Sequence, residues 1–337
     1  MSARTARVAQ PICRLAALLL LPLLALGAVA EEQKPAPAPA AEGTPPAVTV
    51  PIHYLTKAYD EPPPLSLVDP IVTDNGLQGA RLGIADNEDL LGVADLPEAK
   101  GSIIFNVRLS DDDLRGEQCR SNIFHIAPSN AMRADALAQY LVWKKWPRWY
   151  LLKGTSDADY VTAVERAAGR FGGKIVGETS YKFDPSNPRT DSGHQQIQTQ
   201  MPEVTQGAPE HDVVWVADTV EHFGEYVPYR VYDPRPVVGT QGLVAVAWHC
   251  SYEQYAGTQM QHRFERFAKR IMTERDYSAW IAVRAIGEAV TRSGKSDIAD
   301  IRSYLLSDRF TVAAFKGEGL SFRKWDRQLR QPMLITG

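Results

Sequence analysis

Cysteine is scarce in this chain, which has three cysteines among its 337 residues. The sequence also contains no Cys-x-x-Cys pair, no Gly-x-Ser-x-Gly turn and no His-Glu-x-x-His helix. Such patterns supply the thiols, nucleophiles and metal ligands of many redox enzymes and hydrolases, so no recognisable catalytic group of residues remains. We therefore expect a protein that is not an enzyme, with no cofactor and no metal site.

An excess of positive charge is also missing. Lysine and arginine number 37 against 40 aspartates and glutamates, a net charge of −3. The first 30 residues hold three of the arginines and no acid, so without them 34 basic residues face 40 acidic ones, a net charge of −6. A nucleic-acid-binding surface needs a basic stripe, so we expect no nucleic-acid partner.

Long apolar runs are confined to the N-terminus. Residues 15–26 are apolar apart from Pro22, they follow three arginines, and the small residues Ala28 and Ala30 precede Glu31. This order is typical of a secretory signal peptide cleaved after Ala30. The alternative is a membrane anchor, for which the run falls short of the ~20 residues that a span needs.

The exported chain would begin with a spacer and keep two cysteines. Residues 31–48 are rich in alanine and proline and predict a linker without a packed core. Cys13 precedes the apolar run, which argues against a lipid-anchored cysteine. Cys119 and Cys250 could form a disulfide in an oxidising compartment or remain two separate thiols, and the sequence does not decide between them.

The body of the chain alternates between short apolar runs and amphipathic segments. The runs predict strands at 101–107, 122–126, 149–152, 174–177, 212–217 and 243–247. Helical spacing predicts helices at 131–146, 157–171, 259–272, 277–291 and 297–306, with a closing strand or hairpin within 321–334. Strands that alternate with helices of this length indicate parallel βαβ units and an α/β fold.

Several segments together resemble a known family. Residues 122–130, 140–146, 149–152 and 167–176 are similar to type I periplasmic binding proteins of ABC transporters, in the branch that binds branched-chain amino acids. Residues 319–332 resemble a narrower group, associated with pyrroloquinoline-quinone-dependent (PQQ-dependent) alcohol dehydrogenase systems. The resemblance covers most of the chain after residue 76.

The resemblance implies two α/β lobes with parallel sheets and a ligand between them. The boundaries that we expect are 49–128 and 250–310 for lobe I, and 129–249 and 311–337 for lobe II. Only residues 86–100 stand where the family has several βα units, so we expect a first lobe that is trimmed or shortened by an internal deletion.

The family pattern also implies particular ligand-binding residues. A hydroxyl after the first strand holds a carboxylate, and Ser110 matches it; the alternative is a solvated loop serine. An aromatic residue after an aspartate covers the ligand, and Tyr160 after Asp157 matches; the alternative is packing within its own lobe. We expect Ser110 and Tyr160 to face the cleft and not a core.

Acidic residues add further candidates. The resemblance implies an acid after the strand at 212–217 that pairs with an amino group, and either Asp218 or Glu221 could do this. Asp111 begins three consecutive aspartates, which either cap a helix or form a weak hard-cation site. His249 follows another strand and could contact the ligand, although a single histidine is weak support for a metal.

The resulting hypothesis is a periplasmic solute-binding component of an ABC-type importer. Its partners would be a small-molecule solute, linked to PQQ-dependent alcohol oxidation, and a membrane permease, and we expect a monomer. One alternative is a periplasmic interaction or sensor protein that keeps the fold without a functional pocket. Another is a receptor for calcium or a lanthanide.

Overall fold

The computed structural model describes residues 51–53, 94–97, 99–182 and 194–337. The predicted signal peptide and the linker up to residue 48 lie outside these residues, as does most of the segment 86–100.

Strands and helices follow the predicted order. The strands are β1 (Ile104–Asn106), β2 (Ile123–His125), β3 (Arg148–Lys153), β4 (Lys174–Ser180), β5 (Val213–Ala217), β6 (Val237–Gly239), β7 (Leu243–Val246), β8 (Val312–Ala313), β9 (Gly319–Phe322), β10 (Leu329–Arg330) and β11 (Leu334–Thr336). The helices are α3 (Asn130–Trp143), α4 (Ala158–Phe171), α5 (His194–Thr205), α6 (Val227–Arg230), α7 (Gly257–Ala268), α8 (Glu274–Ser293) and α9 (Ile298–Leu305). The predicted α/β alternation is therefore confirmed.

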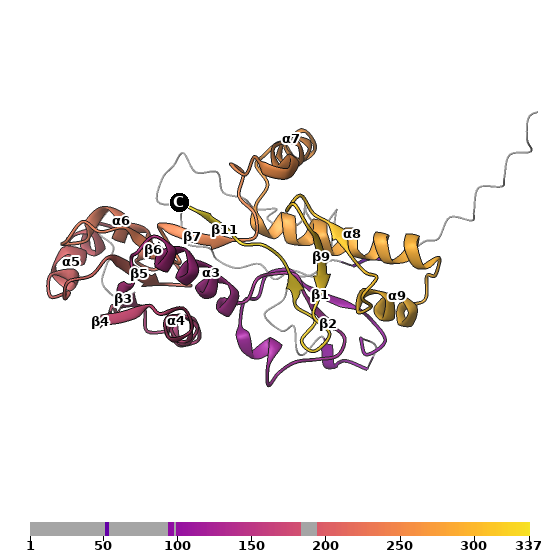
Figure 1. The fold of residues 1–337 in the computed structure, drawn as a ribbon, viewed down its shortest axis with the longest axis horizontal. Helices are drawn as coiled ribbons and strands as arrows, with labels where there is room; N and C mark the ends of the chain where they lie inside the picture. The colour runs from indigo at the N-terminus through magenta and orange to yellow at the C-terminus, as the bar shows by residue number, and fades with distance from the viewer. Residues whose placement is uncertain (1–50, 54–93, 98, 183–193) are drawn as a thin grey trace, which may run out of the picture. The chain divides into compact units, whose positions relative to one another are not determined.

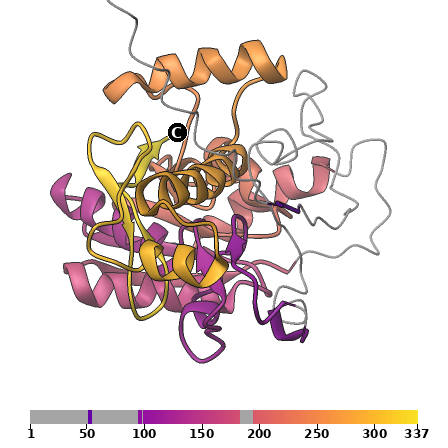
Figure 2. The ribbon, with the colours of Figure 1, turned by 90° about the vertical axis from the view of Figure 1, so that its right-hand side faces the viewer.

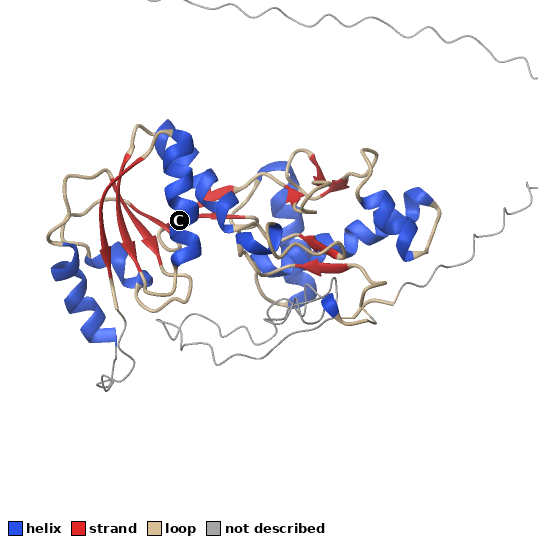
Figure 3. Cartoon of the chain, turned by 90° about the horizontal axis from the view of Figure 1, so that it is seen from below, coloured by secondary structure: helices blue, strands red, loops and turns tan. Residues whose placement is uncertain are grey.

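Six strands form one sheet, in the order β11-β7-β6-β5-β3-β4. All neighbours pair in parallel except β11, which is antiparallel to β7. Successive strand side chains point to opposite faces: Trp149 and Leu151 pack with α3 and α4, whereas Tyr150 and Leu152 pack with α5 and α6. Helices therefore cover both faces of this sheet (Figures 1 and 3).

The two helices on one face begin and end as their sequences predict. The Ser129 hydroxyl accepts a hydrogen bond from the Met132 amide at 3.2 Å and caps α3. Gly172 ends α4 in the left-handed conformation, with φ 82°, which glycine adopts without a Cβ clash. Because α3 follows β2 and α4 follows β3, both helix N-termini lie just beyond the carboxyl ends of strands.

A second group of elements has its own core. β1 and β2 pair in parallel, β8–β10 form a small antiparallel sheet, and both lie beside α8 and α9 (Figures 1 and 2). Aromatic rings fill this core, with Phe124 and Phe322 meeting edge to face at 5.1 Å. Within the described residues, the parallel sheet here has only two strands.

The C-terminal segment divides between the two groups. We expected residues 311–337 to belong to lobe II, with residues 129–249. In the structure Val312, Leu320 and Leu329 are buried in the core of the second group, and β11 joins the six-stranded sheet. Strands β8–β10 therefore belong to the second group, whereas β11 belongs to the six-stranded sheet.

A set of partly buried polar contacts, here called the junction, joins the two groups where the chain crosses between them. Arg133 of α3 donates to the Ala245 carbonyl at 2.8 Å and to the Glu274 carboxylate of α8 at 2.8 Å. Glu274 also accepts from the Ala247 amide. Lys316 donates to the carbonyls of Ala247 and Pro332. The junction consists of Arg133, Ala245, Ala247, Glu274 and Lys316.

Two further expectations concern single features. Cys119 and Cys250 are free thiols, so no disulfide joins them; the Cys119 sulfur accepts a hydrogen bond from Arg327 at 3.2 Å. Across the described residues, no helix combines the length and apolar character that a membrane crossing requires.

The buried lysine of the junction predicts a pH dependence of stability. Burial lowers the pKa of Lys316 from 10.5 to about 8. Between pH 8 and 10.5 the unfolded chain therefore binds more protons than the folded protein, so this group makes the free energy of unfolding rise with pH. We would measure the free energy of unfolding in urea for the parent and for Lys316→Met. The difference, parent minus variant, should increase by about 3 kcal/mol between pH 8 and 10.5. A flat difference would contradict the burial of a charged ammonium.

Candidate functional site

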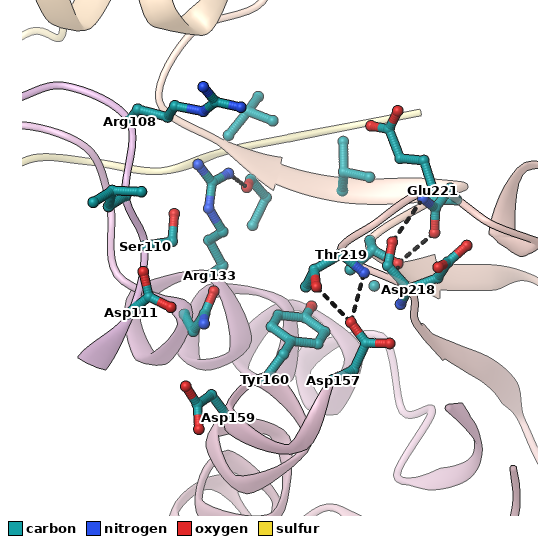
Figure 4. Close-up of a pocket in the computed structure, with 18 of the residues that line it drawn as sticks. Arg108, Ser110, Asp111, Arg133, Asp157, Asp159, Tyr160, Asp218, Thr219 and Glu221 are labelled. Carbon is teal, nitrogen blue, oxygen red and sulfur yellow. Dashed lines mark hydrogen bonds between the residues drawn. The ribbon is translucent and has the colours of Figure 1, made fainter. Parts of the chain in front are cut away.

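A cavity of about 510 Å³ lies at the carboxyl ends of β1, β3, β5 and β6 and at the N-termini of α3 and α4 (Figure 4). Such strand ends are the usual ligand site of parallel α/β sheets, because the loops there carry side chains and the helices offer free amides. Loops from both groups of elements, together with Arg133 and Glu274 of the junction, form its walls.

The loop after β1 holds Ser110 at one wall. Arg115 fixes this loop by donating to the carbonyls of Leu109, Asp111 and Ala127 at 2.8–2.9 Å. Burial lowers the pKa of Arg115 to about 10, so the guanidinium stays charged at neutral pH. The Ser110 carbonyl accepts from the Asn130 amide at 2.8 Å, whereas its hydroxyl makes no hydrogen bond to a described residue. That hydroxyl is thus available to a ligand.

The three aspartates that follow do not converge. Asp111 lines the cavity, and Asp112 accepts from the Ala131 amide at 2.9 Å, so its carboxylate caps α3. Burial raises the pKa of Asp112. Among the residues that the structure describes, no three histidine, cysteine, aspartate or glutamate side chains cluster closely enough to hold a metal ion. The geometry therefore favours helix capping over a cation site for this triplet.

Tyr160 lies in the first turn of α4 and contacts both the cavity and a core. Its side chain points into the space between Arg133 and Thr219 (Figure 4). Only 2% of the residue is exposed, and it packs in the core with Trp215. Burial raises the pKa of the Tyr160 hydroxyl to about 12, so it is neutral. We expected Tyr160 to face the cleft and not a core. The expectation that it avoids a core is wrong, because the ring lines the cavity and also packs in the core.

Asp157, which immediately precedes α4, connects two loops of the cavity. One carboxylate oxygen accepts hydrogen bonds from the amide, at 2.7 Å, and from the hydroxyl of Thr219. Asp157 follows β3 and Thr219 follows β5, so this contact sets the spacing of the two loops (Figure 4).

The two acids after β5 have different surroundings. The Asp218 carboxylate accepts hydrogen bonds from the amides of His222, Phe223 and Gly224 at 2.6–3.0 Å and is 1% exposed. Glu221 is exposed on the cavity wall, with a left-handed backbone at φ 57°. Asp218 therefore shapes the loop, and Glu221 is the acid better placed to meet a ligand, a choice that the sequence left open.

His249 does not lie with the other candidates. It is absent from the cavity walls, and its Nδ1 lies 2.7 Å from the Ser251 hydroxyl. The preceding Trp248 is 2% exposed and stacks on Tyr277 at 4.7 Å. The chain after β7 thus turns toward the second core and carries His249 away from the cavity.

Other wall residues were not singled out from the sequence. Arg133 and Glu274 are 141 positions apart in the chain, so no local pattern reveals that they form a pair. Thr240 and Gln241 follow β6, a three-residue strand too short for a periodicity signal. Gly239 ends that strand with φ 121°, and a Cβ there would lie 2.2 Å from the Val216 carbonyl oxygen.

Matched substitutions at the two acids should separate loop shaping from cavity exposure. Asp218→Asn would place an amide nitrogen or a weaker acceptor against three backbone amides. We expect its free energy of unfolding in urea to fall by about 2–3 kcal/mol. Glu221→Gln should stay within about 0.5 kcal/mol of the parent. Equal losses in the two variants would refute the distinction.

Comparison with known proteins agrees with this geometry. Residues 79–337 match the family model described as "Periplasmic binding protein". No curated protein matches the chain.

Solved structures of the same architecture are similar to it at low identity. A periplasmic binding protein from Burkholderia mallei has 15% identity and a TM-score of 0.55, over 73% of this chain and 66% of that one. A leucine-, isoleucine-, valine-, threonine- and alanine-binding protein from Brucella ovis, in a closed conformation, has 15% identity and a TM-score of 0.57, over 69% and 63%. A solute-binding protein from R. palustris in complex with benzoate has 10% identity and a TM-score of 0.57, over 77% and 87%.

The chain spans less than two thirds of the length of the first two of these structures. At these identities the structures show a shared fold, and the family match covers well over half of the sequence. The chain belongs to the periplasmic binding protein family.

Proposed function

We propose that this protein binds a small solute in the cavity between its two groups of elements. The observation that carries the proposal is the origin of the walls: Ser110 comes from the loop after β1, whereas Tyr160 comes from α4 and Glu221 from the loop after β5, both next to the six-stranded sheet. A ligand that touches both sides binds a closed arrangement better than an open one, which is the energetic condition for closure around a solute.

The setting follows from the family. Membership of a periplasmic binding protein family implies a periplasmic location, to which the expected signal peptide would direct the chain. Structures similar to this one include substrate-binding proteins of amino acid ABC transporters. We therefore propose that a membrane permease of an ABC importer receives the solute, and that the protein works as a monomer.

The finer proposal concerns the source of the solute. Residues 319–332 carry the resemblance to proteins of PQQ-dependent alcohol dehydrogenase systems. In this chain they form the hairpin of β9 and β10, where Gln328 accepts from Arg115 at 2.9 Å and so supports the Ser110 loop. We propose a solute linked to alcohol oxidation, such as an alcohol, its acid product or the quinone.

The alternative of a sensor that has lost its pocket has less support. A cavity of about 510 Å³, lined by loops that partly buried hydrogen bonds hold in place, is suited to a ligand.

Substitutions on opposite walls test the proposal. A thermal-shift screen of alcohols, their carboxylic acids, amino acids, PQQ and calcium or lanthanide salts should find a compound that raises the melting temperature by several degrees. Ser110→Ala and Tyr160→Phe should each weaken its binding about 3- to 10-fold in calorimetry, since each removes one hydroxyl. Ser121→Ala, an exposed serine outside the cavity, is the matched control.

Tyr160→Phe is preferred to Tyr160→Ala, because the ring belongs to a core and its removal would lower stability without any ligand. If Ser110→Ala and Tyr160→Phe both bind the identified compound as tightly as Ser121→Ala, the solute does not occupy this cavity.

A further inference from the structure

A basic and aromatic surface lies at the amino ends of β3 and β4, just after the ends of α3 and α4. The Lys174 amide donates to the Pro147 carbonyl at 2.7 Å, and Lys174 pairs with Arg148 across β4 and β3. These contacts bring residues 140–148 and 166–174 together at one end of the six-stranded sheet. The two segments contain no aspartate or glutamate and six cationic residues: Lys144, Lys145, Arg148, Arg166, Arg170 and Lys174.

Neighbouring acids match only half of this positive charge. The three arginines form ion pairs at 2.7–3.0 Å with three carboxylates, those of Asp135, Glu210 and Asp212. Lys144, Lys145 and Lys174 are exposed, and none of them forms an ion pair within the part of the chain that the structure describes. A chain with a net charge of −3 therefore carries a local excess of positive charge here.

Large aromatic rings accompany the three lysines. Trp143, the last residue of α3, is 70% exposed. The Lys144 ammonium lies 5.1 Å from the centroid of the Trp143 ring and 5.6 Å from that of Tyr140, so cation and rings attract one another. Trp146 is partly exposed in the following turn. This surface, here called the lysine–tryptophan patch, consists of Trp143, Lys144, Lys145, Trp146 and Lys174.

The composition of the patch fits a lipid surface better than a protein surface. Lysine is depleted at protein–protein interfaces, where arginine is enriched, and the arginines here are already paired. Lysines near a bilayer are attracted to anionic headgroups and need no fixed geometry to gain from them. Tryptophan concentrates at membrane–water interfaces, where one end of the ring system is apolar and the other is wet.

The patch and the cavity lie at opposite ends of β3. Asp157 and Tyr160 of the cavity follow the carboxyl end of this strand, whereas Trp143 and Lys145 precede its amino end. The six residues of β3 span about 20 Å. A flat surface in contact with the patch therefore need not cover the cavity.

We propose that the lysine–tryptophan patch adsorbs this protein on bilayers that contain anionic phospholipid. The Trp143 ring enters the headgroup region, and the ammonium groups of Lys144, Lys145 and Lys174 lie against the phosphates. Adsorption is a property beyond solute binding, and it would keep the protein at the surface where the proposed permease lies.

Co-sedimentation with lipid vesicles tests the proposal. The exported protein, with its start at Glu31 checked by mass spectrometry, excludes the apolar run of residues 15–26 as a lipid-binding element. We expect it to bind vesicles of phosphatidylcholine with an equal amount of phosphatidylglycerol at least 10-fold more tightly than vesicles of phosphatidylcholine alone. Binding should fall several-fold between about 20 and 300 mM NaCl, because salt screens the attraction.

Removal of the three lysine charges locates the contact. The triple variant Lys144→Gln, Lys145→Asn and Lys174→Gln should weaken binding to the anionic vesicles at least 10-fold. Asparagine is chosen at position 145 because the backbone there is left-handed, with φ 66°. The matched control removes three exposed cations from α7 and should stay within about 2-fold of the parent; its changes are Arg263→Gln, Arg266→Gln and Lys269→Asn.

A second pair of variants tests the aromatic part of the patch. Trp143→Ala should weaken vesicle binding about 3- to 10-fold, because it removes the ring that enters the headgroup region. Trp325→Ala is the control, at a tryptophan that is 67% exposed and also lies beside two guanidinium groups. Acids pair with the cations next to Trp325, so this variant should bind vesicles as the parent does.

The changed side chains are exposed, so each variant should keep the melting temperature of the parent within a few degrees. Equal binding to neutral and anionic vesicles would overturn the proposal, as would an equal loss in the patch triple variant and the α7 triple variant. If polyglutamate binds in place of the vesicles, and the patch triple variant loses that binding, the patch fits an acidic protein and the lipid contact is refuted.

Discussion

The salt bridge between Arg133 and Glu274 joins two separately packed groups of elements beside the cavity. Arg133 also holds the Ala245 carbonyl, Glu274 holds the Ala247 amide, and Lys316 holds the Ala247 carbonyl. Each partner is at least partly withdrawn from water, so removing one would leave another charge unpaired, which costs far more than a surface ion pair returns. The junction therefore fixes where the loops of the two groups meet.

The loops themselves are held by polar contacts within each group. Arg115 fastens the Ser110 loop, Asp157 fastens Thr219, and Asp218 folds the turn at 222–224. Because these loops are ordered by their own bonds, a solute need not order them, and less of its binding free energy is lost. Each wall can thus behave as a rigid surface.

Much of the fold was predictable from the sequence because local physics specifies it. Buried strands read as apolar runs, Ser129 signals a helix start, and Gly172 signals a helix end. Placing Ser110 and Glu221 needed the family resemblance, and the structure puts both on one cavity. The function of Asp218, the burial of Tyr160 and the Arg133–Glu274 pair depend on tertiary contacts between distant segments, which leave no local pattern.

Hydrogen–deuterium exchange with and without the solute tests the central claim, that one ligand contacts both walls of this cavity. The account predicts slower exchange in residues 108–111, 156–160 and 218–221 together when solute is bound, with little change in α7, which contributes nothing to the cavity walls. Protection confined to one wall, or centred on α7, would contradict the account.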